Sequence, residues 1–354
     1  MSASSAEPPA RVIRLQPLTR HRVAALGAAG AAWSAALPEV LAGLERDWSI
    51  VVGRGLPGGS ASYVTRARRA DGSRAVVKVA VTGEGWTEQV ATLKRAAGRG
   101  YVRLLRSDLR RRAVLLEELG PSLASRSPPV RDQLRCLADT LALAWQDPGD
   151  TRPAPGRDKA SGLAELIRQA WRRLDRPCSI RVVDQALAYA ERRAAEADRS
   201  LVIVHGDPHP GNLLAVLGSR PGADTGYVFV DPDGFVADRA YDLGVVLRDW
   251  SSTLLGPDAR TVAEGYCTVL AERTGVDAQR IWEWGFLERV STGLYLLDVV
   301  RGPDRVARPY LESAERLVPD IQSVLRQASR DGEIRLTYGE LTALIADAVQ
   351  HLRE

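Results

Sequence analysis

Two polar loops, each placed directly after a short apolar run, constrain the fold of this 354-residue chain more than any other feature. The first loop covers residues 205–212 and reads His-Gly-Asp-Pro-His-Pro-Gly-Asn, and the second begins at Asp231 and reads Asp-Pro-Asp-Gly. Apolar runs that end in turn residues are typical of short buried strands. Two such strands are expected to bring Asp207, Asn212 and Asp231 together, which predicts an active site.

These three side chains match the needs of phosphoryl transfer from a metal–nucleotide complex. One carboxylate orients the acceptor hydroxyl and takes its proton, while an amide oxygen and a second carboxylate hold Mg²⁺ on the phosphates. The step of five positions from Asp207 to Asn212 equals the step in the catalytic loop of protein kinases. The spacing therefore favours kinase-type chemistry.

Two other interpretations of the first loop are open to the sequence. His205 and His209 are four positions apart, which would suit zinc ligands on a helix, but Pro208 and Pro210 oppose a helix here. A structural turn could also contain an aspartate and an asparagine. The apolar runs before both loops favour the active-site interpretation, because they direct two polar loops to one place.

A lysine in the middle of a β-rich run marks a second candidate site upstream. Residues 74–81 read Arg-Ala-Val-Val-Lys-Val-Ala-Val, and Lys78 is similar to the strand lysine that contacts nucleotide phosphates in kinases. A lysine on an edge strand that points to water is the alternative. Residues 53–62 form a glycine-rich stretch that includes Ser60, and glycines let backbone N–H groups approach phosphates closely. We therefore expect Ser60 and its loop to contribute to nucleotide binding.

The next segments continue the expected nucleotide site. Glu88 begins a helical stretch and is expected to pair with Lys78, with Glu84 as the alternative partner and an exposed position at the helix N-terminus as a further interpretation. Residues 113–120 read as an apolar strand that ends in polar residues and glycine. In a two-lobed kinase this segment would be the hinge whose backbone binds adenine. Two nucleotide-binding residues are predicted there: Glu117 and Leu119.

Four segments carry a resemblance to a known family: residues 98–105 (Gly-Arg-Gly-Tyr-Val-Arg-Leu-Leu), 115–120 (Leu-Leu-Glu-Glu-Leu-Gly), 205–212 and 230–234 (Val-Asp-Pro-Asp-Gly). The chain resembles the aminoglycoside phosphotransferase and choline kinase superfamily. Within it, the chain is most similar to the aminoglycoside 6-phosphotransferases, also described as aminoglycoside/hydroxyurea resistance kinases. The resemblance runs from about residue 50 to about residue 305. It implies an α+β, two-lobed protein-kinase-like fold with a small β-rich N-lobe and a larger, mainly helical C-lobe.

The resemblance implies a role for each matching position. Asp207 would be the general base that accepts the proton of the acceptor hydroxyl. Asn212 and Asp231 would bind Mg²⁺, and Lys78 would hold the α- and β-phosphates of ATP. Two further residues would support the catalytic loop: His205 and Asp242.

Carboxylates in the C-terminal half are candidates for contacts with the acceptor. Asp233 departs from the family pattern, and it could lie near the metal, form part of a turn or contact the substrate. A cationic aminoglycoside would need carboxylates for its ammonium or guanidinium groups. The other candidates are Asp249, Glu283, Glu288 and Asp298. Each of them could instead be an exposed helix acid, but Asp298 is favoured because it interrupts an apolar run.

The sequence predicts four successive parts. Residues 1–47 form an N-terminal extension, expected to be partly disordered and then helical, and residues 48–119 form the N-lobe. Residues 120–328 form the helical C-lobe, which carries the catalytic loop and a hairpin loop at residues 218–226. Residues 329–354 form a C-terminal tail in which a capping-box pattern precedes an amphipathic helix.

Composition narrows the possible partners. The net charge is +4, but the arginines are dispersed and no aromatic-interleaved basic motif occurs, so nucleic-acid binding is not expected. Three scattered cysteines imply neither a disulfide framework nor a metal site. The apolar runs are too short to span a bilayer, and the first residues do not form a signal peptide. We therefore expect a cytoplasmic enzyme that does not bind membranes.

The residues and the resemblance together predict an ATP- and Mg²⁺-dependent O-phosphotransferase. Its acceptor would be a hydroxyl of a small molecule, an aminoglycoside of streptomycin type, and phosphorylation would inactivate the antibiotic. Two alternatives are a kinase for another small alcohol, of choline, macrolide or metabolite type, and a catalytically silent nucleotide-binding regulatory module. The intact Asp207, Asn212 and Asp231 disfavour the silent module. Monomer and dimer are equally compatible with the sequence.

Overall fold

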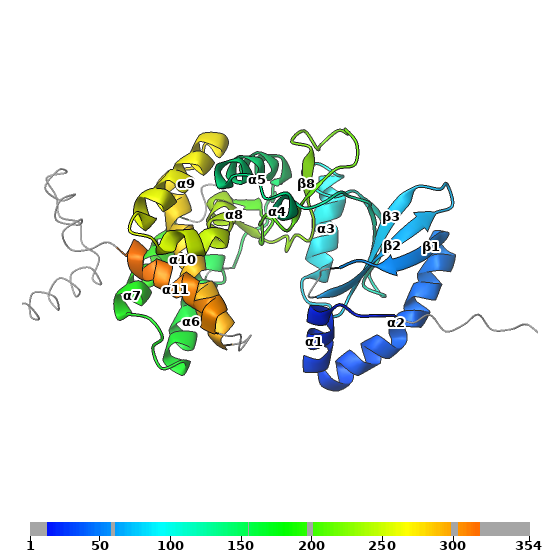
Figure 1. Cartoon of the computed structure of the whole chain (residues 1–354), viewed down its shortest axis with the longest axis horizontal. Helices are drawn as coiled ribbons and strands as arrows, with labels where there is room; N and C mark the ends of the chain where they lie inside the picture. The colour runs from blue at the N-terminus through cyan, green and yellow to red at the C-terminus, as the bar shows by residue number, and fades with distance from the viewer. Residues whose placement is uncertain (1–12, 58–60, 155, 197–200, 299–303, 319–354) are drawn as a thin grey trace, which may run out of the picture. The chain divides into compact units, whose positions relative to one another are not determined.

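The structure is a computed structural model that describes residues 13–57, 61–154, 156–196, 201–298 and 304–318. The predicted disordered tip, Ser60 and the predicted tail helix lie outside these residues. The chain forms two compact units (Figure 1). The first takes Met1–Gly120 with Ala215–Val228, and the second takes Pro121–Leu214 with Phe229–Glu354.

An antiparallel five-stranded sheet in the order β1-β2-β3-β5-β4 forms the centre of the first unit. Its strands are β1 (Ile50–Gly55), β2 (Ser62–Arg69), β3 (Arg74–Ala80), β4 (Leu104–Asp108) and β5 (Ala113–Glu117). The turn between β2 and β3 contains Gly72 at φ 80°, and Asp71 Oδ1 accepts a hydrogen bond from the Ser73 amide. Lys78 lies in the central strand β3, opposite Val64 on one side and Val114 on the other.

The N-terminal helices belong to the core of this unit. They are α1 (Pro17–Ala25) and α2 (Gly27–Trp48), and α3 (Trp86–Ala96) follows β3. Leu37, Leu41 and Leu44 of α2 are almost completely buried in one cluster with the side chains of β1, β2, β3 and β5. Burial of each such leucine contributes about 1.5–3 kcal/mol, so α2 is an integral layer of the first unit.

The hairpin formed by β7 (Leu213–Ala215) and β8 (Tyr227–Phe229) departs from the predicted continuous C-lobe. Residues 215–228 cluster with the first unit. Arg220 contributes to this, because its guanidinium forms an ion pair with Glu117 and donates hydrogen bonds to the carbonyls of Gly98 (2.7 Å) and Tyr101 (3.0 Å). No sequence pattern distinguishes this arginine from those in ordinary surface loops.

The second unit is mainly helical. Its elements are α4 (Leu123–Arg126), α5 (Val130–Ala144), α6 (Lys159–Arg173), α7 (Ile180–Ala195), β6 (Leu201–Ile203), β9 (Val236–Asp238), α8 (Arg239–Val246), the 3-10 helix η2 (Leu247–Leu255), α9 (Ala259–Thr274), α10 (Ala278–Asp298) and α11 (Asp304–Leu317). None of the helices in the described residues is long and apolar enough to cross a membrane.

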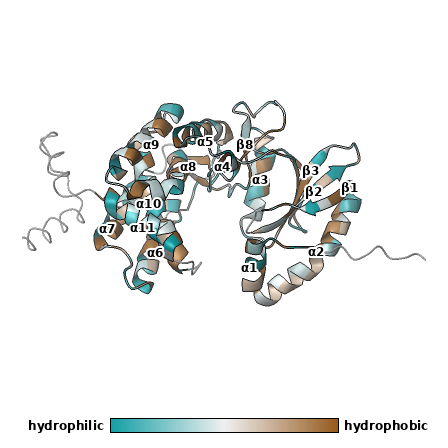
Figure 2. Cartoon of the chain, viewed as in Figure 1, coloured by the Kyte–Doolittle hydropathy of each residue, from teal (hydrophilic) through white to brown (hydrophobic). Residues whose placement is uncertain are grey.

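Helix α10 is the centre of this unit, because α6, α7, α8, α9 and α11 all pack against it. Helix α8 is buried along nearly its whole length, and Figure 2 shows it mainly brown, the colour of hydrophobic residues. The two helices cross closely at Gly244, where a Cβ atom would lie 2.5 Å from the Trp284 Cβ. This tight crossing fixes α8, the helix that carries Asp242, in the interior.

Candidate active site

The two polar loops lie against each other in the second unit. The Asp233 amide donates a hydrogen bond to the His205 carbonyl (2.7 Å). In the first loop, Gly206 has φ 93°, and a Cβ atom at this position would lie 2.6 Å from the Asp233 Cβ. Only glycine fits this contact, so the first loop requires its glycine to meet the second.

A buried carboxylate holds the backbone of the first loop through hydrogen bonds. Asp242 is fully buried and accepts hydrogen bonds from the backbone amides of His205 (2.8 Å) and Gly206 (2.9 Å). A third hydrogen bond comes from the Trp145 indole (2.9 Å). Burial raises the pKa of Asp242 to about 6, although these three hydrogen bonds favour the carboxylate. Asp242 thus holds the backbone immediately before Asp207.

His205 is a second structural support, and its hydrogen bonds define its tautomer. Its Nδ1 accepts a hydrogen bond from the Asp207 amide (3.1 Å), so the proton is on Nε2, which donates to the Val230 carbonyl (2.9 Å). Burial lowers the pKa of His205 to about 4, which keeps the ring neutral near pH 7. Since both ring nitrogens are engaged within the fold, His205 has none left for zinc.

The pKa of His205 predicts a pH dependence of stability. The folded-state pKa lies below the ordinary value of 6.5, so the unfolded chain binds the proton more readily. The His205 contribution is therefore fully present above pH 6.5 and is lost as the pH falls from about 6.5 to about 4. We expect this group to lower the free energy of unfolding by up to about 1.4 kcal/mol per pH unit in that window.

Urea unfolding at a series of pH values, compared between the wild type and His205→Asn, measures this contribution. Asn can still accept the Asp207 amide hydrogen bond but does not titrate. The difference between the two stability curves should shrink as the pH falls below 6.5. Parallel curves would show that His205 does not titrate in this way.

The β7–β8 hairpin brings Asn212 and Asp231 together. Asn212 directly precedes β7, Asp231 follows β8, and the Val230 amide donates a hydrogen bond to the Asn212 carbonyl (2.9 Å). The side-chain nitrogen of Asn212, Nδ2, donates a hydrogen bond to the Asp207 carbonyl (3.1 Å). The side-chain oxygen of Asn212 is thus left to bind a metal. Asp231 adopts φ 57°, an uncommon conformation for a non-glycine residue that clusters at functional sites.

The donor set fits Mg²⁺ bound together with nucleotide phosphates. One amide oxygen and one carboxylate are too few for a complete protein site, and the described residues contain no group of three His, Cys, Asp or Glu side chains arranged to hold a metal. Mg²⁺ is usually bound through one or two protein groups plus phosphates and water. Asn212 and Asp231 therefore suit a metal that arrives with the nucleotide.

The Asp207 carboxylate lies between the side chains of an arginine and a histidine. Its Oδ1 forms an ion pair with the Arg248 Nη2, and its Oδ2 is 3.7 Å from the His209 Nε2. Burial acts to raise the pKa of Asp207, but Arg248 and His209 outweigh it, and the pKa is lowered. Asp207 is therefore a carboxylate near pH 7. Nothing in the sequence distinguishes Arg248 from the dispersed arginines, so its contact with Asp207 is revealed only by the structure.

The predicted acceptor-binding acids divide into two groups. Asp233 and Asp249 interact electrostatically with Asp207 and Arg248. Three others are paired within the fold: Glu288 with Arg248, Asp298 with Arg173 and Glu283 with Arg192 and Arg193. Glu283 and Glu288 are buried, at 2% and 4% exposed, so the alternative that they are exposed helix acids is wrong. Asp298 connects α10 to α6 through its hydrogen bond with Arg173.

A pocket of about 390 Å³ in the second unit has the wrong charge for a cationic acceptor. Its lining includes Arg152, Arg157 and Lys159, together with Phe235. Lys159 lies 5.1 Å from the centre of the Phe235 ring. We therefore do not place the ammonium or guanidinium groups of an aminoglycoside in this pocket.

The nucleotide candidates of the first unit show one clear departure from prediction. Lys78 Nζ donates a hydrogen bond to the Gln89 Oε1 (3.1 Å), whereas Glu88 is exposed. Adjacent helix positions point about 100° apart. Because α3 presents Gln89 to β3, the predicted Lys78–Glu88 pair is wrong.

The predicted hinge is held by its own contacts. The Glu117 carboxylate accepts the Arg103 amide hydrogen bond (2.8 Å) and pairs with Arg220. After Leu119, the Gly120 amide donates to the Ala215 carbonyl (2.7 Å). The Glu117 side chain is thus occupied within the fold, and any adenine contact from this segment would come from its backbone.

Known proteins are similar to this chain in sequence and in fold. A family model described as aminoglycoside/hydroxyurea antibiotic resistance kinase matches residues 47–299. Streptomycin 6-kinase from Streptomyces glaucescens is 30% identical over 283 residues, which cover 79% of this chain and 89% of that protein. Hydroxyurea phosphotransferase from Kitasatospora aureofaciens is 29% identical over 221 residues, which cover 61% of this chain and 62% of that protein.

Among solved structures, a thermostable mutant of aminoglycoside phosphotransferase APH(4)-Ia has a TM-score of 0.53 and 14% identity, over 78% of this chain and 97% of that one. At this identity the likeness concerns the fold alone, and it confirms the predicted α+β kinase-like fold class. The sequence relatives confirm the predicted enzyme class, a phosphotransferase with an alcohol group of a small molecule as acceptor. Since the matched residues 47–299 make up most of the chain, it belongs to the aminoglycoside/hydroxyurea antibiotic resistance kinase family.

Proposed function

We propose that the protein transfers the γ-phosphoryl group of ATP to a hydroxyl of an aminoglycoside of streptomycin type and thereby inactivates the antibiotic. The observation that carries this proposal is the arrangement of Asp207, Asn212 and Asp231, which the Asn212–Asp207 and Val230–Asn212 hydrogen bonds hold in one site. The similarity to a streptomycin 6-kinase over 79% of this chain supports the choice of acceptor. Action in the cytoplasm, where ATP is available, completes the proposal.

Asp207 would act on the acceptor hydroxyl. The hydroxyl donates a hydrogen bond to the carboxylate, its oxygen forms a new bond to the γ-phosphorus, and the bond from the γ-phosphorus to ADP breaks. The hydroxyl proton passes to the Asp207 carboxylate and then to solvent. A positioned base of this kind contributes roughly 10²–10⁴-fold to the rate.

The remaining groups would bind and orient the nucleotide. Asn212 and Asp231 would hold Mg²⁺, which when bound neutralises charge on the phosphate oxygens. Lys78 would contact the α- and β-phosphates, and the backbone near Glu117 and Leu119 would bind adenine. Positioning and charge stabilisation of this kind account for most of the catalysis in phosphoryl transfer.

Carboxylates would recognise the cationic groups of the acceptor. Asp233 and Asp249 are the leading candidates, because both interact electrostatically with Asp207 and, among the residues that the structure describes, neither has a hydrogen-bonded arginine of the kind that pairs with Asp298. Charge-assisted hydrogen bonds to ammonium or guanidinium groups are about twice as strong as neutral ones. Two acids beside the base would therefore favour a cationic acceptor.

ADP release from purified protein with ATP and Mg²⁺ tests the proposal. The acceptor panel should contain streptomycin, other aminoglycosides, hydroxyurea and choline. We expect turnover with streptomycin and little with choline. Turnover with hydroxyurea alone would assign the other activity named among the relatives, and nucleotide binding without turnover on any acceptor would favour the silent regulatory module.

A further inference from the structure

Arg248 connects the candidate base to a buried acid. It lies at the start of η2, directly after α8, and its side chain is 19% exposed. One guanidinium nitrogen, Nη2, forms an ion pair with the Asp207 Oδ1, and the other, Nη1, is 3.5 Å from the Glu288 Oε2. Because the guanidinium is planar, contacts at both ends fix its orientation.

The far side of Arg248 is anchored by Glu288. This residue is 4% exposed on α10, and its carboxylate contributes to the raised pKa of Tyr241. The Tyr241 hydroxyl lies 3.4 Å from the Gly206 carbonyl, which belongs to the residue before Asp207. Arg248 thus connects Asp207 to the buried Glu288 carboxylate, and Tyr241 contacts the residue before Asp207.

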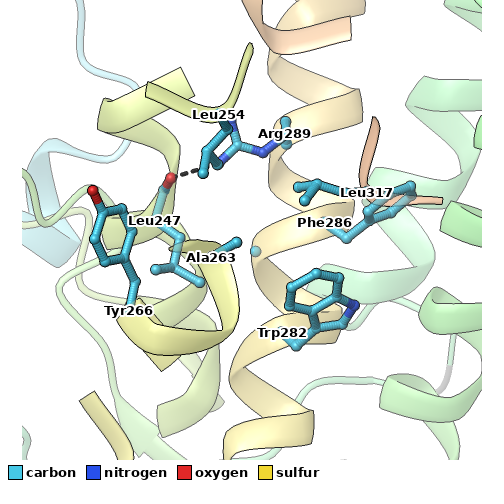
Figure 3. Close-up of a pocket in the computed structure, with 9 residues that line it drawn as sticks. Leu247, Leu254, Ala263, Tyr266, Trp282, Phe286, Arg289 and Leu317 are labelled. Carbon is cyan, nitrogen blue, oxygen red and sulfur yellow. Dashed lines mark hydrogen bonds between the residues drawn. The ribbon is translucent and has the colours of Figure 1, made fainter. Parts of the chain in front are cut away.

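The backbone that carries Arg248 is held as well. The fully buried guanidinium of Arg289 donates hydrogen bonds to the Leu247 carbonyl (2.6 Å) and to the Ser251 hydroxyl (2.5 Å), both in η2. Figure 3 shows this guanidinium above a pocket in which Leu247 and Leu254 of η2 face side chains of α9, α10 and α11. The pocket has room for about 10 Å³, enough for at most one water molecule, so η2 packs closely against these helices.

We propose that Arg248 is a positioning residue that holds Asp207 with Oδ1 engaged and Oδ2 presented to the acceptor hydroxyl. This inference rests on the proposed function, because it takes Asp207 as the base. A carboxylate that is free to rotate about its terminal bond would present either oxygen in many directions. The second contact of Arg248, with Glu288, removes that freedom before the substrate binds.

The positive charge of Arg248 and the orientation that it imposes have opposite effects on the reactivity of Asp207. A cation beside a carboxylate makes it a weaker base, which by itself would slow proton transfer. In phosphoryl transfer the proton contributes less than the alignment of the reacting oxygen, because catalysis relies mainly on positioning and electrostatic stabilisation. Glu288 also keeps Arg248 paired after Asp207 has taken the proton, so no isolated buried cation arises during the reaction. Orientation therefore outweighs the loss of basicity.

Kinetics of Arg248→Met and Arg248→Lys test this role. We expect Arg248→Met to lower kcat roughly 10²-fold, the loss caused by a small misplacement of a reacting group, with KM for ATP and for the acceptor unchanged. Arg248→Lys should recover part of kcat, because an ammonium can still contact Asp207 but cannot connect two carboxylates. A large rise in KM for ATP with little change in kcat would show that Arg248 binds phosphate instead. Unchanged kcat and KM would show that Arg248 does not position Asp207.

Two comparisons separate positioning from simple destabilisation. Arg248→Met leaves the buried Glu288 carboxylate without its arginine, and a buried charge without a partner destabilises a fold. The double variant Arg248→Met/Glu288→Gln removes that unpaired charge, and the loss of kcat should persist in it. Recovery of kcat in the double variant would overturn the proposal. Arg273→Met is the matched control, since it removes an exposed arginine–carboxylate pair with Asp139 between α9 and α5.

ADP release with water as the acceptor keeps this test separate from the choice of substrate. Asp207 would also orient the attacking water, so the rate of this slow ATP hydrolysis should fall most in Arg248→Met and less in Arg248→Lys. Wild-type protein without turnover on any aminoglycoside would count against the proposed acceptor, while the order of the variants in ATP hydrolysis would still support or overturn the role of Arg248.

Discussion

Asp207→Asn is expected to lower kcat for phosphoryl transfer by roughly 10²–10⁴-fold while nucleotide affinity is retained. The amide has the size of the carboxylate but cannot accept the hydroxyl proton. It also preserves the backbone hydrogen bonds of the loop, from the Asp207 amide to His205 and from Asn212 to the Asp207 carbonyl. Asn is preferable to Ala here, because Ala would also leave a gap beside Arg248.

Steady-state kinetics and direct titration of nucleotide binding measure the two parts of this prediction separately. Asp224→Asn is the matched control, since Asp224 is an exposed aspartate in the β7–β8 hairpin and should tolerate the change. A variant at Asp207 that loses nucleotide binding together with turnover would assign this residue a structural role. Retained turnover would remove it from the mechanism.

Asp231→Asn is expected to lower kcat by roughly 10²-fold or more at ordinary Mg²⁺ concentrations, because a bound divalent ion contributes several kcal/mol to the transition state. Asp231 adopts φ 57°. Asn accepts this left-handed conformation as readily as Asp, so the substitution removes the negative charge without straining the backbone. The remaining ligand would be a neutral amide, and the Mg²⁺ concentration for half-maximal rate should rise.

Rates measured over a range of Mg²⁺ concentrations test this expectation. Asp175→Asn is a matched control, because Asp175 has φ 53° and is exposed just after α6. The control should have wild-type kinetics and wild-type stability. An Asp231→Asn protein with an unchanged kcat and an unchanged Mg²⁺ requirement would contradict the metal role.

The sequence predicted the fold class and the two loops well because their signals are local. A strand followed by glycine, proline and polar residues has few alternatives, whereas the tight contact between Gly206 and Asp233 joins two separate loops and is seen only in the structure. The helical part of the N-terminal extension was also predicted, since a helical pattern depends only on the local sequence. Its place in the core of the first unit was not, because that depends on the sheet that covers it.

Long-range contacts between charged side chains could not be predicted from one sequence. Arg248 and Glu288 are 40 positions apart, and Arg220 and Glu117 are 103 apart. Each resembles a surface residue in its local sequence, and only the packing of α10 or of the hairpin gives it a partner. The predicted partner of Lys78, Glu88, is one position away from the observed partner, Gln89. Helical spacing does not fix which residue of the first turn of α3 faces β3.

Mass spectrometry of streptomycin after incubation with the purified protein, ATP and Mg²⁺ tests the central claim most directly. The account predicts a product that carries one added phosphoryl group, formed by the wild type and absent with Asp207→Asn. Unmodified streptomycin after incubation with active, nucleotide-binding wild-type protein would contradict the proposed substrate. Equal product from the wild type and from Asp207→Asn would contradict the proposed mechanism.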